Sequence, residues 1–163
     1  LFRSVDEYRI MRFLHHGIDR ETAAKYNDIY MRNVHTAILF NDVLPTLKDL
    51  NSRGYRLYVF SNGPPITQRI KIEQSGIAAY VDEIFISAEL GEGKPSKAAY
   101  DAVIKRINAP TEEILMVGDS YENDCVAAEN AGLHAVQINR RNKPIINYQN
   151  QISSLSEIYT FLI

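Results

Sequence analysis

A short apolar run that ends in a glycine and two carboxylates constrains the fold of this chain more than any other feature. Residues 114–117 read Ile-Leu-Met-Val, Gly118 follows, and Asp119 and Asp124 lie just beyond it. An apolar run this short, between turn-forming residues, is typical of a parallel strand buried on both faces. Asp119 is therefore predicted at the carboxyl end of a strand, with Asp124 returning towards it as the next helix begins.

The two carboxylates allow two interpretations. Ligands of open parallel sheets bind at the carboxyl ends of the strands, and two carboxylates in one crevice repel each other unless a cation or a shared proton relieves them. Oxygen ligands of this kind suit Mg²⁺, so Asp119 and Asp124 are candidate metal ligands. In the alternative interpretation, the two residues only cap a helix over about residues 123–131.

An alternation of strands and helices from Tyr55 onward predicts an α/β fold with a doubly wound parallel sheet. Helices of this length between strands are crossover connections, which make the strands parallel. A final helix is expected from Ser154. The other expected elements are strands at about residues 55–60, 83–87, 114–117 and 135–138, and helices near residues 66–75, 97–108 and 123–131.

The chain before this alternation is expected to form a helical unit. We place a boundary near residue 40, with helices over residues 1–39 and the α/β core over residues 40–163. Ser4 and Glu7 have the spacing of a capping box, and Gly17 is suited to end the first helix. The two helices of this unit are expected to form an antiparallel hairpin.

Composition excludes several classes of function. The net charge of -2 gives no support to a nucleic-acid partner, because such proteins usually carry a basic face. No apolar run approaches the roughly 20 residues of a membrane-spanning helix. The single cysteine, Cys125, cannot form an internal disulfide. A cytoplasmic, reducing setting is therefore expected.

Two further strand ends carry polar residues that suit an anion. Ser61, Asn62 and Gly63 offer a hydroxyl, an amide and a freed backbone where a helix begins, which favours a phosphate. Asn-Gly is also ordinary turn chemistry. Lys94 follows the next strand and supplies a positive charge, although a lone loop lysine is usually solvated. Together with the paired aspartates, these residues predict a site for phosphate and Mg²⁺ at one sheet edge.

The motifs as a set resemble those of the haloacid dehalogenase-like (HAD) hydrolases. The resemblance covers residues 40–163 and makes residues 1–39 the remnant of a helical cap. Gln68 and Lys71, downstream of the serine motif, resemble the branch containing pyrimidine 5'-nucleotidases and N-acylneuraminate-9-phosphatases. The matching motifs are Ser61-Asn62 for the second, Lys94-Pro95 for the third, and Gly118-Asp119-Ser120 with Asn123-Asp124 for the fourth.

The resemblance implies a function and a role for each residue. The expected activity is Mg²⁺-dependent hydrolysis of a small phosphorylated metabolite, such as a nucleotide or sugar phosphate, through an aspartyl-phosphate. Ser61 would bind the transferring phosphoryl group with the help of Asn62. Lys94 would stabilise negative charge. Asp119 would bind Mg²⁺, and Asp124 would support the metal or hold Lys94.

One family motif is absent from these residues. The Asp-x-Asp-x-Thr signature, which supplies the nucleophile and the general acid/base, has only an imitation at residues 41–46, which lacks the second aspartate. The strand that carries it in the family lies between the strands ending at Ser61 and Asp119. Its loss would leave strand edges unpaired. We therefore expect a C-terminal part of a longer protein, with a central first strand missing, that is inactive by itself.

Two other functions compete with this prediction. A regulatory domain that kept the phosphate pocket and lost the nucleophile would bind phosphate without turnover. The metal-independent 2-haloacid dehalogenases of the same family carry serine and asparagine where this chain has Gly118-Asp119. The acidic Asp119 therefore favours phosphate chemistry. An Asp-x-Asp pair upstream of Leu1 would discriminate an enzyme from a binding domain.

Overall fold

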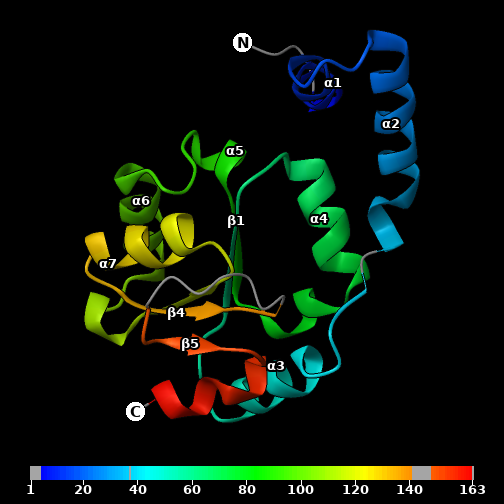
Figure 1. Ribbon diagram of the computed structural model, residues 1–163. Helices are drawn as coiled ribbons and strands as arrows, with labels where there is room; N and C mark the ends of the chain where they lie inside the picture. Colours follow the sequence, from blue (N-terminus) through cyan, green and yellow to red (C-terminus); the bar gives the residue numbers. More distant parts are fainter. Residues whose placement is uncertain (1–4, 37, 141–147, 163) are drawn as a thin grey trace.

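The computed structural model describes residues 5–36, 38–140 and 148–162, and its strands all pair in parallel (Figure 1). β1 (Tyr58–Ser61) pairs with β2 (Glu83–Ile86). β4 (His134–Ile138) pairs with β3 (Leu115–Gly118) on one side and with β5 (Gln151–Ile152) on the other. The parallel α/β architecture predicted from the sequence is confirmed.

The strands of the described residues do not join in one sheet, and the missing central strand expected between β1 and β3 stays a prediction. They form two sheets, in the orders β1-β2 and β3-β4-β5, because β1 and β3 do not pair with each other. The short β5 was not predicted, since two residues carry no periodicity. The remaining elements are α1 (Val5–His15), α2 (Arg20–Asn33), η1 (Val34–Thr36), α3 (Val43–Ser52), α4 (Pro65–Gln74), η2 (Ile77–Tyr80), α5 (Ser87–Leu90), α6 (Lys97–Ile107), η3 (Thr111–Glu113), η4 (Tyr121–Val126), α7 (Ala127–Asn130) and η5 (Leu155–Phe161).

Strand β4 has apolar packing on both of its faces, as a doubly wound sheet requires. Successive strand residues point to opposite faces. Ala135 packs in a cluster with Tyr100 of α6 and Ala128 of α7. Val136 packs in a second cluster with Leu50 of α3 and Ile158 of η5. Figure 1 shows α6 and α7 on one side of the strands and α3 with η5 on another.

One predicted helix is built differently from the expectation. Residues 123–131 were predicted as a single helix, whereas the chain forms the π-helical η4 followed by the short α7. Ser120 caps η4, because its hydroxyl accepts a hydrogen bond from the Asn123 N–H at 3.3 Å. The wider π-helical turn is common at functional sites, and here it contains Asp124.

The first two helices pack together, and η1, which follows them, packs against α4 (Figure 1). Phe13 and Tyr26 meet edge to face at 5.6 Å. Helix α1 is viewed almost end-on where α2 runs along the picture plane, so the two cross steeply and the antiparallel prediction was wrong. The predicted stop at Gly17 is confirmed by its φ of 79°. Ser4 of the predicted capping box lies outside the described residues, and the boundary near residue 40 stays a prediction.

No helix within the described ranges is long and apolar enough to cross a membrane.

Candidate functional site

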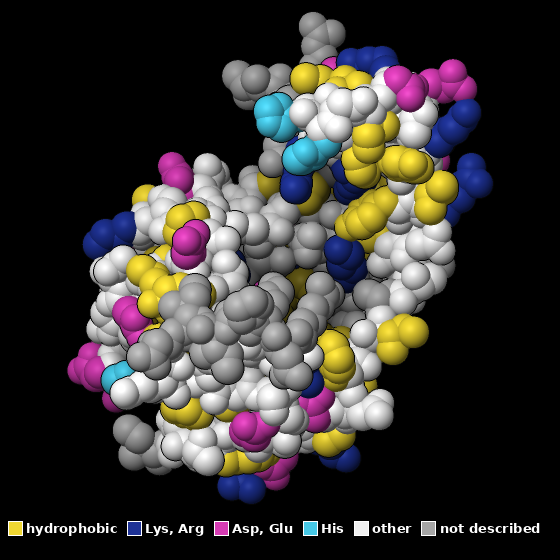
Figure 2. Space-filling view, in the orientation of Figure 1, with side chains coloured by type: hydrophobic (Ala, Val, Ile, Leu, Met, Phe, Trp, Pro, Cys, Tyr) yellow, Lys and Arg dark blue, Asp and Glu magenta, His cyan; other side chains and the backbone are white. Residues whose placement is uncertain are grey.

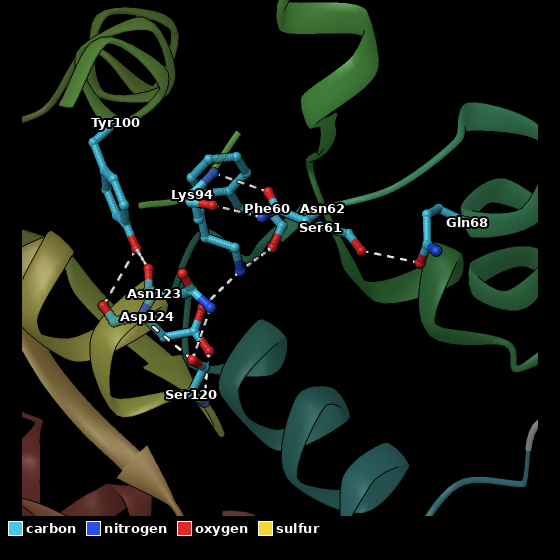
Figure 3. A network of polar contacts seen from close by, with 9 residues as sticks. All are labelled: Phe60, Ser61, Asn62, Gln68, Lys94, Tyr100, Ser120, Asn123 and Asp124. Atoms are coloured by element: carbon cyan, nitrogen blue, oxygen red, sulfur yellow. Dashed lines mark hydrogen bonds and ion pairs between the residues drawn. The ribbon is translucent and has the colours of Figure 1, made fainter. Parts of the chain in front are cut away.

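A lysine and an aspartate join the carboxyl ends of β1 and β3 (Figure 3). Lys94 Nζ donates to Asp124 Oδ1 at 2.7 Å and to the Phe60 carbonyl at 2.9 Å. The two side chains are only 11% and 6% exposed. Lys94 is therefore not a solvated loop lysine. Removing two charges from water is unfavourable unless both find partners, so this pair has a specific task in the fold or the function.

The second oxygen of Asp124 is also engaged. Asp124 Oδ2 accepts a hydrogen bond from the Ser120 N–H at 2.9 Å. Gly118 makes this arrangement possible, because a Cβ built on it would lie 2.2 Å from Asp124 Oδ2. The glycine at the end of β3 thus lets the aspartate fold back over the strand, as the sequence predicted.

Tyr100 holds the backbone of the same segment. Its hydroxyl donates to the Asn123 carbonyl at 2.8 Å and lies 3.3 Å from the Asp124 carbonyl. Burial, with a smaller contribution from the negative charge of Asp124, raises the pKa of Tyr100 well above its usual value. The phenol therefore stays protonated and remains a donor. Sequence reasoning missed this residue, because nothing in the helical pattern of α6 separates it from an ordinary core residue.

Asn62 positions the lysine loop. Its Nδ2 donates to the Lys94 carbonyl at 2.7 Å, and its Oδ1 accepts from the Lys94 N–H at 2.9 Å (Figure 3). Gly93 leaves the room, because a Cβ there would lie 3.0 Å from Asn62 Oδ1. Asn62 was predicted to assist in substrate binding. In the structure both ends of its amide bind the backbone of Lys94, so it acts on the lysine.

Ser61 and Gly63 belong to the turn between β1 and α4. The Ser61 hydroxyl donates to Gln68 Oε1 at 3.0 Å. The Gly63 N–H donates to the Ser87 hydroxyl at 3.0 Å, so the amide expected to bind an anion is already used. Gly63 has a φ of 142°, and a Cβ there would lie 2.8 Å from Gln68 Nε2. The sequence analysis singled out Gln68 only for its resemblance to one branch of the family. It did not single out Ser87.

Asp119 is the open carboxylate of the site. The residue is exposed, and its main-chain carbonyl accepts from Gln137 Nε2 at 3.2 Å. Its carboxylate has no hydrogen bond or ion pair with any part of the chain that the structure describes. The described residues contain no group of three or more acidic, histidine or cysteine side chains arranged for a metal. An exposed carboxylate of this kind nevertheless fits Mg²⁺, which often takes one or two carboxylates and keeps several waters.

The aspartate of the imitation motif has a structural task. The Asp42 carboxylate accepts from Arg140 Nη2 at 2.8 Å, from the Ser154 hydroxyl at 2.8 Å and from the Leu155 N–H at 2.5 Å. The hydrogen bond from Arg140 is the main reason that the pKa of Asp42 lies well below its usual range. Asp42 joins the start of α3 to the start of η5, and these contacts favour a structural role over that of a nucleophile.

Together, the fold and the site define the class of protein. Parallel strands place a hydroxyl, a lysine clamped by an aspartate, and an open carboxylate at one edge, where α/β proteins bind ligands. A family model described as haloacid dehalogenase-like hydrolase matches residues 4–132 of the chain. The chain therefore belongs to the haloacid dehalogenase-like hydrolase family.

Curated relatives of the chain are phosphatases. A glyceraldehyde 3-phosphate phosphatase of Methanothermobacter thermautotrophicus is 38% identical over 113 residues, which are 68% of this chain and 50% of that protein. The pyrimidine 5'-nucleotidase PynA of Streptococcus pneumoniae is 28% identical over 153 residues, covering 91% of this chain and 62% of that protein. The chain thus spans about half the length of the curated relatives that it matches first.

Solved structures agree with the family assignment. The magnesium-bound HAD hydrolase YfnB of Bacillus subtilis superposes with a TM-score of 0.80 at 25% identity, covering 99% of this chain and 73% of that one. A HAD phosphatase of Thermococcus onnurineus gives a TM-score of 0.76, also at 25% identity, and covers 96% and 86%. A dehalogenase captured with an intermediate gives 0.80 at 23% identity, covering 96% and 70%, and that likeness shows the fold alone.

Proposed function

We propose that the intact protein is a Mg²⁺-dependent phosphohydrolase of a small phosphomonoester, such as a nucleotide or a sugar phosphate. The observation that carries the proposal is Lys94 Nζ, held between the Phe60 carbonyl and Asp124 at the ends of β1 and β3. The curated relatives support it, because those named above act on glyceraldehyde 3-phosphate or pyrimidine nucleotides. We also propose that the protein belongs to the branch of the family that contains the pyrimidine 5'-nucleotidases and N-acylneuraminate-9-phosphatases.

Lys94 and Ser61 are the residues proposed to meet the phosphoryl group. A preorganised cation in a partly dry site stabilises the charge that builds on phosphoryl oxygens. Asp124 and Asn62 act as positioning residues, since one binds the ammonium of Lys94 and the other its backbone. The Ser61 hydroxyl donates a hydrogen bond to Gln68 Oε1 in this structure, and we propose that it donates to a bound phosphate oxygen instead when substrate is present.

Asp119 is proposed to hold Mg²⁺, with Asp124 in support. When bound, the ion would polarise the phosphoryl group and neutralise part of its charge. Asp124 contributes indirectly, since its two oxygens already bind Lys94 and the Ser120 amide. The proposal therefore assigns the direct metal contact to Asp119, whose carboxylate is exposed at the end of β3.

The nucleophile is proposed to lie on a strand outside this sequence that inserts between β1 and β3. Peptide groups of successive strand residues point to opposite edges. The Asp82 N–H donates to the Leu57 carbonyl at 2.7 Å, so the peptide groups of Tyr58 and Phe60 point away from β2. In the same way, the His134 N–H donates to the Ile114 carbonyl at 3.1 Å. The peptide groups of Leu115 and Val117 therefore point away from β4.

These two edges suit a strand between them. No strand within the described ranges pairs with either edge, and every residue of β1 and β3 is only half-buried. An aspartate on such a strand would attack phosphorus while the bond to the leaving oxygen breaks, and that oxygen would take a proton from the general acid that the same motif supplies in the family. Water would then attack the phosphorus of the aspartyl-phosphate, releasing inorganic phosphate and restoring the carboxylate. Splitting the reaction into two steps in this way is covalent catalysis.

The test measures hydrolysis of an aryl phosphate with and without Mg²⁺, on the 163-residue chain and on the protein extended upstream to its natural start. We expect turnover only in the extended protein with Mg²⁺, and its loss in Asp119→Asn. Asp28→Asn is the matched control, because Asp28 is an exposed residue of α2 away from the strand ends. Phosphate binding without metal-dependent turnover in the extended protein would refute the hydrolase and leave a regulatory phosphate-binding domain.

A further inference from the structure

Two cationic side chains converge on one aromatic ring beside the proposed phosphate site. The guanidinium carbon of Arg9 lies 3.9 Å from the centre of the Tyr30 ring, and Lys71 Nζ lies 5.3 Å from it. Arg9 comes from α1, Tyr30 from α2 and Lys71 from α4. Figure 2 shows a hollow between the α1–α2 helices and the rest of the molecule, with Lys and Arg side chains on its walls.

Helix α4 connects this cluster to the phosphate-binding residues. Gln68 binds the Ser61 hydroxyl at 3.0 Å, and Lys71 lies three residues further along α4. Residues three apart on a helix share a face and are separated by about 4.5 Å along the axis. A ligand whose phosphate lies at Ser61 therefore needs only a few further atoms to bring another group to Lys71.

The cluster carries more positive than negative charge. Arg9 Nη1 lies 3.7 Å from Asp6 Oδ1 and donates to Asn27 Oδ1 at 2.5 Å. Lys71 has no ion pair with any part of the chain that the structure describes. Two cations around one ring repel each other, and Asp6, whose side chain is 54% exposed, compensates only one of them weakly. An anion between Lys71 and Arg9 would relieve this repulsion.

We propose that Lys71 and Arg9 bind a second anionic group of the substrate, with the Tyr30 ring holding the two cations in place. The inference rests on the proposed phosphohydrolase function and narrows it to short phosphomonoesters that carry a carboxylate or a second phosphate. The transferred phosphoryl group lies at Ser61 and Lys94, and the second anion lies beyond Gln68.

The experiment compares pairs of phosphate esters that differ in one charged group. In the extended protein with Mg²⁺, 3-phosphoglycerate is compared with glycerol 3-phosphate, and fructose 1,6-bisphosphate with fructose 6-phosphate. The first pair adds a carboxylate and the second adds a phosphate, so the preferred pair identifies the anion. We expect Lys71→Met to lower kcat/KM for the ester that carries the second anionic group by about tenfold, since a charged hydrogen bond is lost. The value for the partner without that group should change less than twofold.

Two further variants separate recognition from structure. Lys71→Arg should retain the preference, and Lys71→Glu should reverse it. Lys105→Met removes an exposed lysine of α6 and should leave both esters unchanged. Equal loss on both members of a pair in Lys71→Met would overturn the inference, as would a wild-type protein without any preference.

The inference and the proposed function fail in different ways. If glycerol 3-phosphate is hydrolysed with Mg²⁺ but Lys71→Met does not alter the preference, only the second-anion site is refuted. If no ester is hydrolysed, the phosphohydrolase is refuted, and the same pairs are compared by calorimetric titration. Equal affinity of the wild type for both members of each pair would then refute the second-anion site as well.

Discussion

The Lys94–Asp124 ion pair should be coupled far more strongly than a surface pair of the same length. In Lys94→Met, the backbone N–H of Ser120 would be the one remaining partner of the Asp124 carboxylate among the described residues. Asp124→Asn would replace two acceptors with one acceptor and one donor. Because Lys94 and Ser120 both donate to this side chain, the amide can satisfy only one of them.

The expected cost follows from burial. Removing one partner of a buried ion pair costs about 3–5 kcal/mol, because the other charge stays in a poorly hydrated place. The exposed fractions of 11% and 6% place this pair in that class. The double variant Lys94→Met/Asp124→Asn leaves no uncompensated charge, so its cost should fall short of the sum of the single costs by about 2 kcal/mol.

The assay is urea unfolding of the intact protein at pH 7, read with two probes to establish that the transition is two-state. The matched control is the Lys97–Asp101 pair of α6, which has the same 2.7 Å separation but side chains that are 68% and 54% exposed. The same substitutions there should give a coupling of about 0.5 kcal/mol or less. Additivity within about 0.5 kcal/mol at Lys94 and Asp124 would refute the reasoning from burial.

Three further expectations concern neighbouring features. Gly118→Ala should destabilise the protein by about 2–4 kcal/mol, since the new methyl group would lie 2.2 Å from Asp124 Oδ2 and 2.5 Å from Asp124 Cβ and overpacking is costly; most of this cost should vanish in an Asp124→Gly background, which removes both atoms, and a full cost there would contradict the geometry. Asp42→Asn should cost about 2 kcal/mol at pH 7. Because Arg140 lowers the pKa of Asp42 in the folded state, this stabilisation is present above the usual aspartate pKa and is lost as pH falls through the folded one. Denaturation midpoints from pH 7 down to 2 should converge for the two proteins, and a constant gap would exclude the linkage. Burial raises the pKa of Cys125 to about 11, so an aromatic disulfide reagent at pH 8 should label it only after urea is added; rapid labelling of the native protein would show that the thiol is accessible.

Local patterns in the sequence were enough for most of the strands and helices. The expected strand at residues 83–87 is observed at Glu83–Ile86, and the expected helix near residues 66–75 at Pro65–Gln74. These predictions succeeded because periodicity and turn residues report local burial and local backbone preference. The π-helical turn of η4 has no such signal, and its contact with Tyr100, whose hydroxyl donates to the Asn123 carbonyl, joins residues 23 positions apart.

The contacts of each site residue depend on residues that are distant in the sequence. The motifs predicted that Lys94, Ser61 and the two aspartates converge, with Asp119 binding Mg²⁺ and Asp124 either supporting the metal or holding Lys94. In the structure Asp124 binds Lys94 while Asp119 stays exposed. Likewise, Asn62 binds the backbone of a residue 32 positions away, which no local pattern encodes.

The sequence by itself determined the parallel α/β class, the strand ends that carry polar residues and the family of the protein. Those properties follow from the order of apolar and turn-forming residues along the chain. Only the tertiary structure decided that Asn62 binds the backbone of Lys94, that β1 and β3 do not pair with each other within the described residues, and that Arg9 and Lys71 meet at Tyr30. The physical reason is that charge pairing and edge pairing depend on distances between segments, which the chain acquires only when its helices and strands pack.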